Sequence, residues 1–249
     1  MTSNHIQDRR GSVARRMFAG FVAALVLMFG GMLFFGYLKA GPDIFEVASR
    51  ASPRQNESIV FVSGDAGLGR WSLGGRVAQQ LAAAGYPVTG VDTLVAFSER
   101  KSPEQTAELL ARAMNAADAH NPGAPIVLMG QSFGSDILPI AIGGLPPAQR
   151  AMISRIILIV PGSQAYLQVS PGEMAGIVPA DLDLAPFALR LPNVPITCIY
   201  GIHEKDSLCP VFANQPNATV IGMPGGHALN RDSNALFSVV TRALRTPAA

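Results

Sequence analysis

Residues 127–135 read Val-Leu-Met-Gly-Gln-Ser-Phe-Gly-Ser, an apolar run that ends in a Gly-x-Ser-x-Gly motif. The apolar residues are typical of a buried strand, and the two glycines predict a sharp turn from that strand into a helix. Such a turn holds Ser132 in a strained conformation and lifts its hydroxyl above the edge of the sheet. The backbone N–H of Phe133, at the start of the helix, would then point toward an oxyanion that forms beside the serine. The motif therefore predicts a nucleophilic serine at position 132.

The composition limits the class of protein. The chain has 249 residues, of which 49% are hydrophobic and 14% charged, so it can bury a sizeable core and is unusually apolar for a soluble protein. One domain plus a membrane segment fits these values best. The formal net charge of +2 gives no support for nucleic-acid binding.

Residues 17–38 predict a transmembrane anchor. This segment of 22 residues contains no charged side chain, and at about 1.5 Å per residue it can cross a hydrocarbon core of about 30 Å. Residues 1–16 carry four arginines close to the segment, at positions 9, 10, 15 and 16, whereas Lys39 is the only base directly after it. The positive-inside rule then predicts a single-pass inner-membrane protein with a cytoplasmic N-terminus and its remaining chain in the periplasm.

Two other interpretations of this segment stay open. A cleaved signal peptide would have a shorter apolar region and a small-x-small cleavage site, which residues 37–42 lack. Residues 15–18, Arg-Arg-Met-Phe, also resemble a twin-arginine export motif. Residues 39–58, with Pro42 and Pro53, are predicted to form a linker to a domain at 59–249.

The domain shows strand and helix patterns in alternation. Apolar, β-branched runs predict strands at 59–62, 86–91, 126–129, 155–160, 196–200 and 218–221, and helical patterns occur at 73–84, 102–120, after 132, and at 233–245. This alternation predicts an α/β fold with a mainly parallel sheet and a ligand site at the carboxyl ends of its strands. Pro139 is expected to kink or end the helix after Ser132. Residues 162–195, with five prolines, are predicted to cross over the site as a small lid.

The loop that follows the first strand is rich in glycine. Residues 63–69 read Ser-Gly-Asp-Ala-Gly-Leu-Gly, and the glycines would let backbone N–H groups approach a ligand closely. The N–H of Asp65 or Ala66 is thus the candidate for a second oxyanion donor. A flexible glycine turn without a role is the alternative.

Two further residues complete a predicted catalytic triad. Asp206 follows the strand at 196–200, and His227 follows the last strand, so both fall at strand ends in the chain order Ser, Asp, His. His227 would act as general base and then as general acid, and Asp206 would fix its tautomer. Glu204 is the alternative acid, because it lies two residues from Asp206.

The remaining histidines and the cysteines are interpreted separately. His203 is expected to be a solvated loop residue, and no spacing of histidine and cysteine predicts a metal site or a cofactor. Cys198 and Cys209, the only cysteines, lie on either side of the acid loop. In an oxidising compartment they are expected to form a disulfide, with two free thiols as the alternative.

Several motifs together resemble the bacterial VirJ and AcvB virulence proteins. The resemblance covers about residues 59–245, and it rests on the segments 62–65, 102–107, 130–139, 145–150, 198–201, 206–210 and 225–227. Two residues depart from the pattern of that family. Ala66 stands where the family usually has a glycine, and Ala228 stands where it usually has a bulkier residue.

This resemblance implies a periplasmic α/β-hydrolase fold. In that family the activity is linked to hydrolysis of aminoacyl-phosphatidylglycerol, and some members support type IV secretion and virulence. The implied partners are therefore a membrane phospholipid or small ester substrate, the inner membrane and components of a secretion system. The alternatives are an esterase or lipase for another ester, and a non-catalytic binding protein of a secretion apparatus.

Overall fold

The computed structural model describes residues 4–34, 41–48, 55–174 and 177–245, and it divides the chain into two units, Met1–Ala40 and Gly41–Ala249. The first unit contains helix α1 (Asn4–Phe34). A search of the described residues finds no helix with the length and apolarity needed to cross a membrane. The end of the predicted anchor, 35–38, and residues 39–40 and 49–54 of the predicted linker lie outside the described residues.

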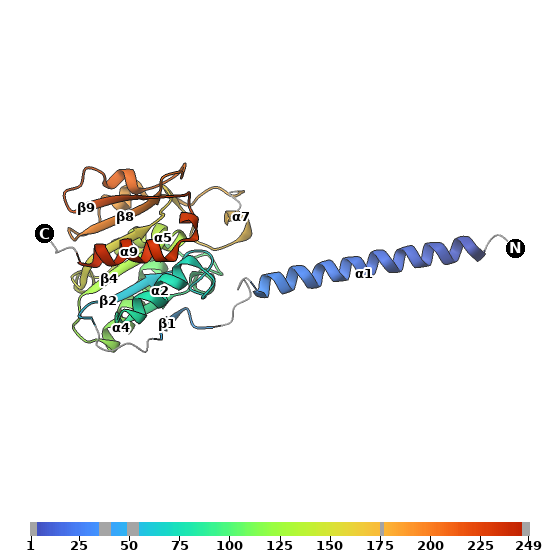
Figure 1. Cartoon of the computed structure of the whole chain (residues 1–249), viewed down its shortest axis with the longest axis horizontal. Helices are drawn as coiled ribbons and strands as arrows, with labels where there is room; N and C mark the ends of the chain where they lie inside the picture. Colours follow the sequence, from blue (N-terminus) through green and yellow to red (C-terminus); the bar gives the residue numbers. More distant parts are fainter. Residues whose placement is uncertain (1–3, 35–40, 49–54, 175–176, 246–249) are drawn as a thin grey trace. The chain divides into compact units, whose positions relative to one another are not determined.

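The second unit is built on a seven-stranded sheet with the order β1-β3-β2-β4-β5-β8-β9 (Figure 1). The strands are β1 (Ile44–Glu46), β2 (Ser58–Val62), β3 (Val88–Val91), β4 (Ile126–Gln131), β5 (Ile153–Ile159), β8 (Ile196–Gly201) and β9 (Ala218–Met223). All neighbouring pairs are parallel except β1 with β3. Because β4 lies in the middle of the sheet, the turn that follows it is surrounded by the loops of its neighbours.

Helices cover both faces of this sheet (Figure 1). Helices α2 (Leu73–Ala83) and α9 (Ser233–Arg245) pack together on one face, and α4 (Pro103–His120) packs with α5 (Phe133–Gly144) on the other. Short helices at α3 (Thr93–Ala96), α6 (Pro147–Arg150), η1 (Cys209–Phe212) and η2 (Leu229–Arg231) complete the connections. Alternate residues of β2 enter different cores: Val60 packs under α4 and α5, whereas Phe61 packs under α2 and α9. A strand buried on both faces needs a continuous apolar run, as residues 59–62 have.

The structure differs from two of the expectations above. Strand β1 lies within the predicted linker, where Ile44 pairs with Val91 and extends the sheet at its edge. Helix α5 does not end at Pro139, one of the two outcomes expected there, but continues to Gly144. The missing N–H removes one helical hydrogen bond, but Leu138 and Ile140 on either side are almost fully buried, and this packing outweighs that loss.

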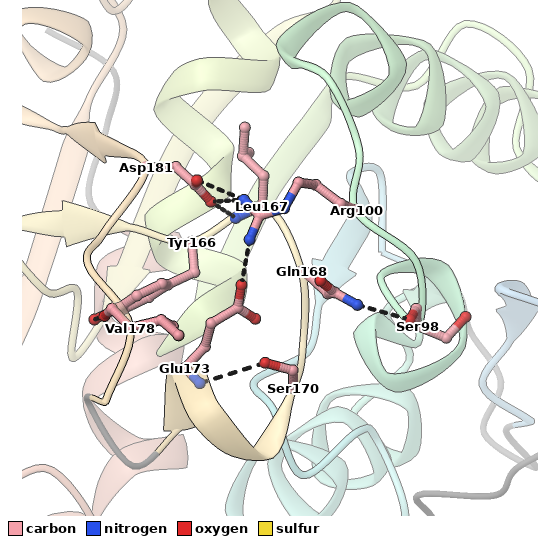
Figure 2. A network of polar contacts seen from close by, with 9 residues as sticks. All are labelled: Ser98, Arg100, Tyr166, Leu167, Gln168, Ser170, Glu173, Val178 and Asp181. Atoms are coloured by element: carbon pink, nitrogen blue, oxygen red, sulfur yellow. Dashed lines mark hydrogen bonds and ion pairs between the residues drawn. The ribbon is translucent and has the colours of Figure 1, made fainter.

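The predicted excursion at 162–195 has its own short elements. These are β6 (Gln164–Ala165), α7 (Pro171–Met174), β7 (Leu182–Asp183) and α8 (Ala185–Ala188), and β6 pairs antiparallel with β7. We call the described residues of its first part, 162–174 and 177–184, the strap. Arg100, from the loop before α4, donates to the carboxylates of Asp181 and Glu173 and so fastens the strap to the domain (Figure 2).

Candidate active site

The turn after β4 has the strained geometry that the motif predicts. Ser132 has a φ of 51°, a conformation that residues other than glycine rarely adopt. A Cβ at Gly130 would lie 2.6 Å from the carbonyl oxygen of Gly134, and a Cβ at Gly134 would lie 2.2 Å from the carbonyl oxygen of Val62. Both glycines are therefore required by close backbone approach, and together they fix the position of the serine.

Ser132 and His227 come from distant parts of the chain and meet at the carboxyl edge of the sheet. The distance from Ser132 Oγ to His227 Nε2 is 2.7 Å, and the distance from His227 Nδ1 to Glu204 Oε1 is also 2.7 Å. The imidazole is thus held between a hydroxyl and a carboxylate. This is the arrangement in which a histidine can remove the proton of a serine during attack on a carbonyl carbon.

The acid in contact with the histidine is Glu204, not the predicted Asp206. The turn Gly201–Glu204 closes through a hydrogen bond from the N–H of Glu204 to the carbonyl of Gly201, and Glu204 Oε2 accepts the N–H of Gly201 at 2.7 Å. This compact turn directs the Glu204 side chain, which is 4% exposed, back toward His227. The glutamate side chain is long enough to reach His227 from this turn. The position of Glu204 directly after β8 is the sequence signal that could have identified it as the acid.

Asp206 lies on the other side of the site, against the beginning of the strap. Its Oδ2 accepts the N–H of Ser163 at 3.1 Å, and it would lie 3.3 Å from a Cβ at Gly162. Asp136, in the first turn of α5, accepts the N–H of Gly162 at 2.8 Å. Two carboxyl groups thus flank Gly162, and Asp136 is not among the site residues predicted from the sequence.

The protonation of these groups depends on their surroundings. The hydrogen bond that His227 Nδ1 donates to Glu204 is the largest cause that raises the pKa of His227, while burial lowers this pKa and the charge of Glu204 raises it further. Burial raises the pKa of Asp136 to about 8, although the Gly162 N–H and the His227 charge act in the opposite direction. Burial also raises the pKa of Asp65. A raised histidine pKa makes the imidazole a stronger base once it has lost its proton.

The loop with the predicted second oxyanion donor lies directly beside the serine. A Cβ at Gly64 would be 3.3 Å from the Cβ of Ser132, so Asp65 and Ala66 follow at the rim of the site. The buried hydroxyl of Thr93 holds this loop, because it donates to the carbonyl of Gly64 at 2.7 Å and contacts the hydroxyl of Ser63 at 2.9 Å.

The N–H groups of Phe133 and Ala66 stay the predicted oxyanion donors. Phe133 is the first residue of α5, so its N–H has no acceptor within the helix. In the described part of the chain, neither this N–H nor that of Ala66 donates to a protein acceptor. Such free donors beside a nucleophile can stabilise a developing oxyanion.

The predicted disulfide between Cys198 and Cys209 is confirmed, and both cysteines are fully buried. It joins β8 to η1 and so closes the loop that carries Glu204. His203 is exposed, and its backbone N–H donates to the carbonyl of Gly225. Among the described residues, no group of three histidine, cysteine or acidic side chains could hold a metal ion.

Comparison with known families identifies the chain. The family model described as "Bacterial virulence protein (VirJ)" matches residues 56–248. The chain belongs to the VirJ family. No curated protein matches it. The match covers every strand of the seven-stranded sheet except β1, and it includes Ser132, Glu204 and His227.

Solved structures show which fold the VirJ domain has. MenH from S. aureus is 15% identical with a TM-score of 0.59, and the alignment covers 82% of this chain and 98% of that one. Lipase BlEst2 from Bacillus licheniformis is 17% identical with a TM-score of 0.59, covering 82% and 99%. Est1E from Butyrivibrio proteoclasticus is 12% identical with a TM-score of 0.57, covering 82% and 94%. The VirJ domain therefore has an α/β-hydrolase fold, as its resemblance implied.

Proposed function

We propose that this VirJ protein is a serine hydrolase that cleaves an ester through an acyl-enzyme intermediate. The observation that carries this proposal is the continuous contact from Ser132 Oγ through the imidazole of His227 to the carboxylate of Glu204. Ser132 Oγ attacks the ester carbonyl carbon while His227 Nε2 takes its proton. The N–H groups of Phe133 and of Asp65 or Ala66 stabilise the oxyanion. His227 then protonates the leaving alcohol, and water releases the acyl group from Ser132 by the same steps.

The proposed substrate is aminoacyl-phosphatidylglycerol, in which an amino acid is esterified to a lipid head group. The activity linked to the VirJ family supports this choice. The surroundings of the nucleophile agree with it, because the charge of Asp65 acts on His227 and Asp206 is exposed in the loop after β8. These two carboxylates suit an acyl group with an ammonium charge. The side chain of His227 is 58% exposed, which gives a bulky head group access.

We also propose that the protein acts at the periplasmic side of the inner membrane. The apolar segment at 17–38 and the arginines before it support this location, as the sequence analysis argued. The disulfide between Cys198 and Cys209 supports an oxidising compartment.

A fluorophosphonate probe tests the catalytic part of the proposal. Such a probe reacts with an activated serine, so it should label the wild-type protein and fail to label Ser132→Ala. Folded wild-type protein that the probe does not label would favour a non-catalytic binding protein with this fold instead.

A substrate panel then tests the lipid. Release of amino acid from aminoacyl-phosphatidylglycerol is compared with hydrolysis of short p-nitrophenyl esters. Labelling of Ser132 without any release from the lipid would leave a serine esterase with another substrate.

A further inference from the structure

Large apolar side chains are exposed in three loops that surround the nucleophile. Trp71 is 78% exposed, Ile177 is 78% exposed and Ile202 is 55% exposed. Trp71 and Ile202 lie in the loops after β2 and β8, and Ile177 follows α7 in the strap. The loops after β2 and β8 lie at the same edge as Ser132, because the carboxyl ends of parallel strands meet there. The strap lies against that edge, since Ser163 donates its N–H to Asp206 and Val169 donates its N–H to the carbonyl of Phe97. We call these residues, together with Val178, the apolar rim.

Ordered backbone carries each part of this rim. The guanidinium of Arg70 stacks 4.9 Å from the ring of Trp71. Ile202 donates its N–H to the carbonyl of Met223, and Ile177 donates its N–H to the carbonyl of Gly172. The exposure is thus a property of folded loops, and burial of these side chains elsewhere in the domain would require rearrangement of those contacts.

The strap that carries Ile177 and Val178 is fixed by charge. Arg100 donates to Glu173 Oε1 at 2.8 Å, and Glu173 has a side chain only 4% exposed. Arg100 also pairs with Asp181, which in turn accepts the N–H of Leu167 at 2.8 Å (Figure 2). Val178 lies on the same side of this network as Tyr166, and the hydroxyl of Tyr166 donates to the carbonyl of Val178 (Figure 2).

Cationic residues accompany the apolar ones. Arg70 precedes Trp71, and Lys205 follows Ile202 by three positions; both cations are exposed. Lys101, 5.8 Å from the ring of Phe97, lies in the loop after β3 at the same edge. Tryptophan, isoleucine and flanking basic side chains are the combination that favours the interface of an anionic bilayer.

We propose that the apolar rim docks this domain on an anionic phospholipid bilayer, with Ser132 facing the head groups. This inference rests on the proposed lipid substrate. Docking in this orientation would let an esterified head group reach the exposed imidazole of His227 without leaving the membrane. The exposed carboxylate of Asp206, which holds the N–H of Ser163 at the beginning of the strap, would then face the head groups and attract the ammonium group of the acyl part.

The single tryptophan of the chain makes the test direct, because all indole fluorescence comes from Trp71. The full-length protein is reconstituted with phosphatidylglycerol or phosphatidylcholine vesicles, with and without brominated acyl chains. Docking predicts a blue-shifted emission that is quenched by brominated phosphatidylglycerol and much less by brominated phosphatidylcholine. Emission that stays accessible to iodide and is not quenched by either lipid would overturn the proposal. A blue shift that occurs without lipid and grows with protein concentration would also overturn the proposal, because it would indicate that Trp71 contacts another copy of the chain.

Two matched variants connect docking with hydrolysis. Ile177→Ser removes a rim side chain and should lower hydrolysis of aminoacyl-phosphatidylglycerol in vesicles by roughly tenfold, while hydrolysis of a soluble p-nitrophenyl ester is unchanged. Leu189→Ser is the control, because Leu189 is 65% exposed but follows α8, outside the residues of the apolar rim. Equal effects of the two variants would count against the rim.

The two proposals can fail separately. Quenching of Trp71 without hydrolysis of any aminoacyl lipid would reject the substrate and leave docking in place. Hydrolysis of the lipid with an unquenched Trp71 would reject docking alone.

Discussion

Replacement of Glu204 by glutamine should nearly abolish activity, although the two side chains have the same shape. Glu204 Oε2 accepts the N–H of Gly201, so the amide oxygen of Glu204→Gln must take that position. Its NH2 group then faces His227 Nδ1, where the carboxylate accepted a hydrogen bond. The imidazole is forced into the tautomer that carries its proton on Nε2, against Ser132, and it cannot act as a base.

The size of this effect follows from the tautomer. An equivalent acid-to-amide change in a serine protease triad lowers the rate by about ten-thousand-fold, which corresponds to about 5 kcal/mol in the activation free energy. Asp206→Asn is the matched control, since its carboxamide oxygen can still accept the N–H of Ser163. Its effect on kcat/KM should stay within about threefold.

The assay is kcat/KM toward a soluble p-nitrophenyl ester for both variants, with thermal unfolding to show that each is folded. If Asp206→Asn lost most of its activity while Glu204→Gln kept it, the assignment of the acid from the observed contacts would be refuted. Comparable losses in both variants would mean that the two carboxylates act as a unit.

Three further predictions follow from the geometry. A protonated His227 cannot take the serine proton, and the pKa of His227 is raised above 6.5. The value of kcat/KM should therefore rise with pH, with a midpoint above 6.5. A midpoint below 6.5 would contradict the contact between His227 and the carboxylate of Glu204. Gly134→Ala should prevent correct folding, because its Cβ would lie 2.2 Å from a backbone oxygen of β2. Gly143→Ala in the same helix is the control: its Cβ would meet nothing within 4 Å, so the melting temperature should stay unchanged or rise. Reduction of the disulfide between Cys198 and Cys209, which are 11 residues apart, should lower the free energy of unfolding by about 3 kcal/mol in denaturant titrations; an unchanged midpoint would show that the bond contributes little.

The structure explains why some features could be predicted and others could not. The serine turn is a local property, because two glycines and a preceding apolar run determine it within a few residues. The disulfide was predictable because the chain has only two cysteines. The strand at 126–129 was predictable because a strand buried on both faces requires an uninterrupted apolar run. Strand β1 was missed because a short edge strand has too few residues for a clear pattern, and its pairing with β3 is a long-range contact.

The sequence by itself determined the type of fold and the pairing of Ser132 with His227, since each depends on residues close together in the chain or on their order along it. Only the tertiary structure decided which carboxylate meets the imidazole. Glu204 and Asp206 are two residues apart in one loop, and the choice depends on how the turn after β8 closes and on its contact with the loop after β9. The structure also revealed Asp136 beside the site, because its proximity to Gly162 arises from the packing of α5 against the strap. Distances between side chains from separate loops depend on the whole sheet, and no local pattern records them.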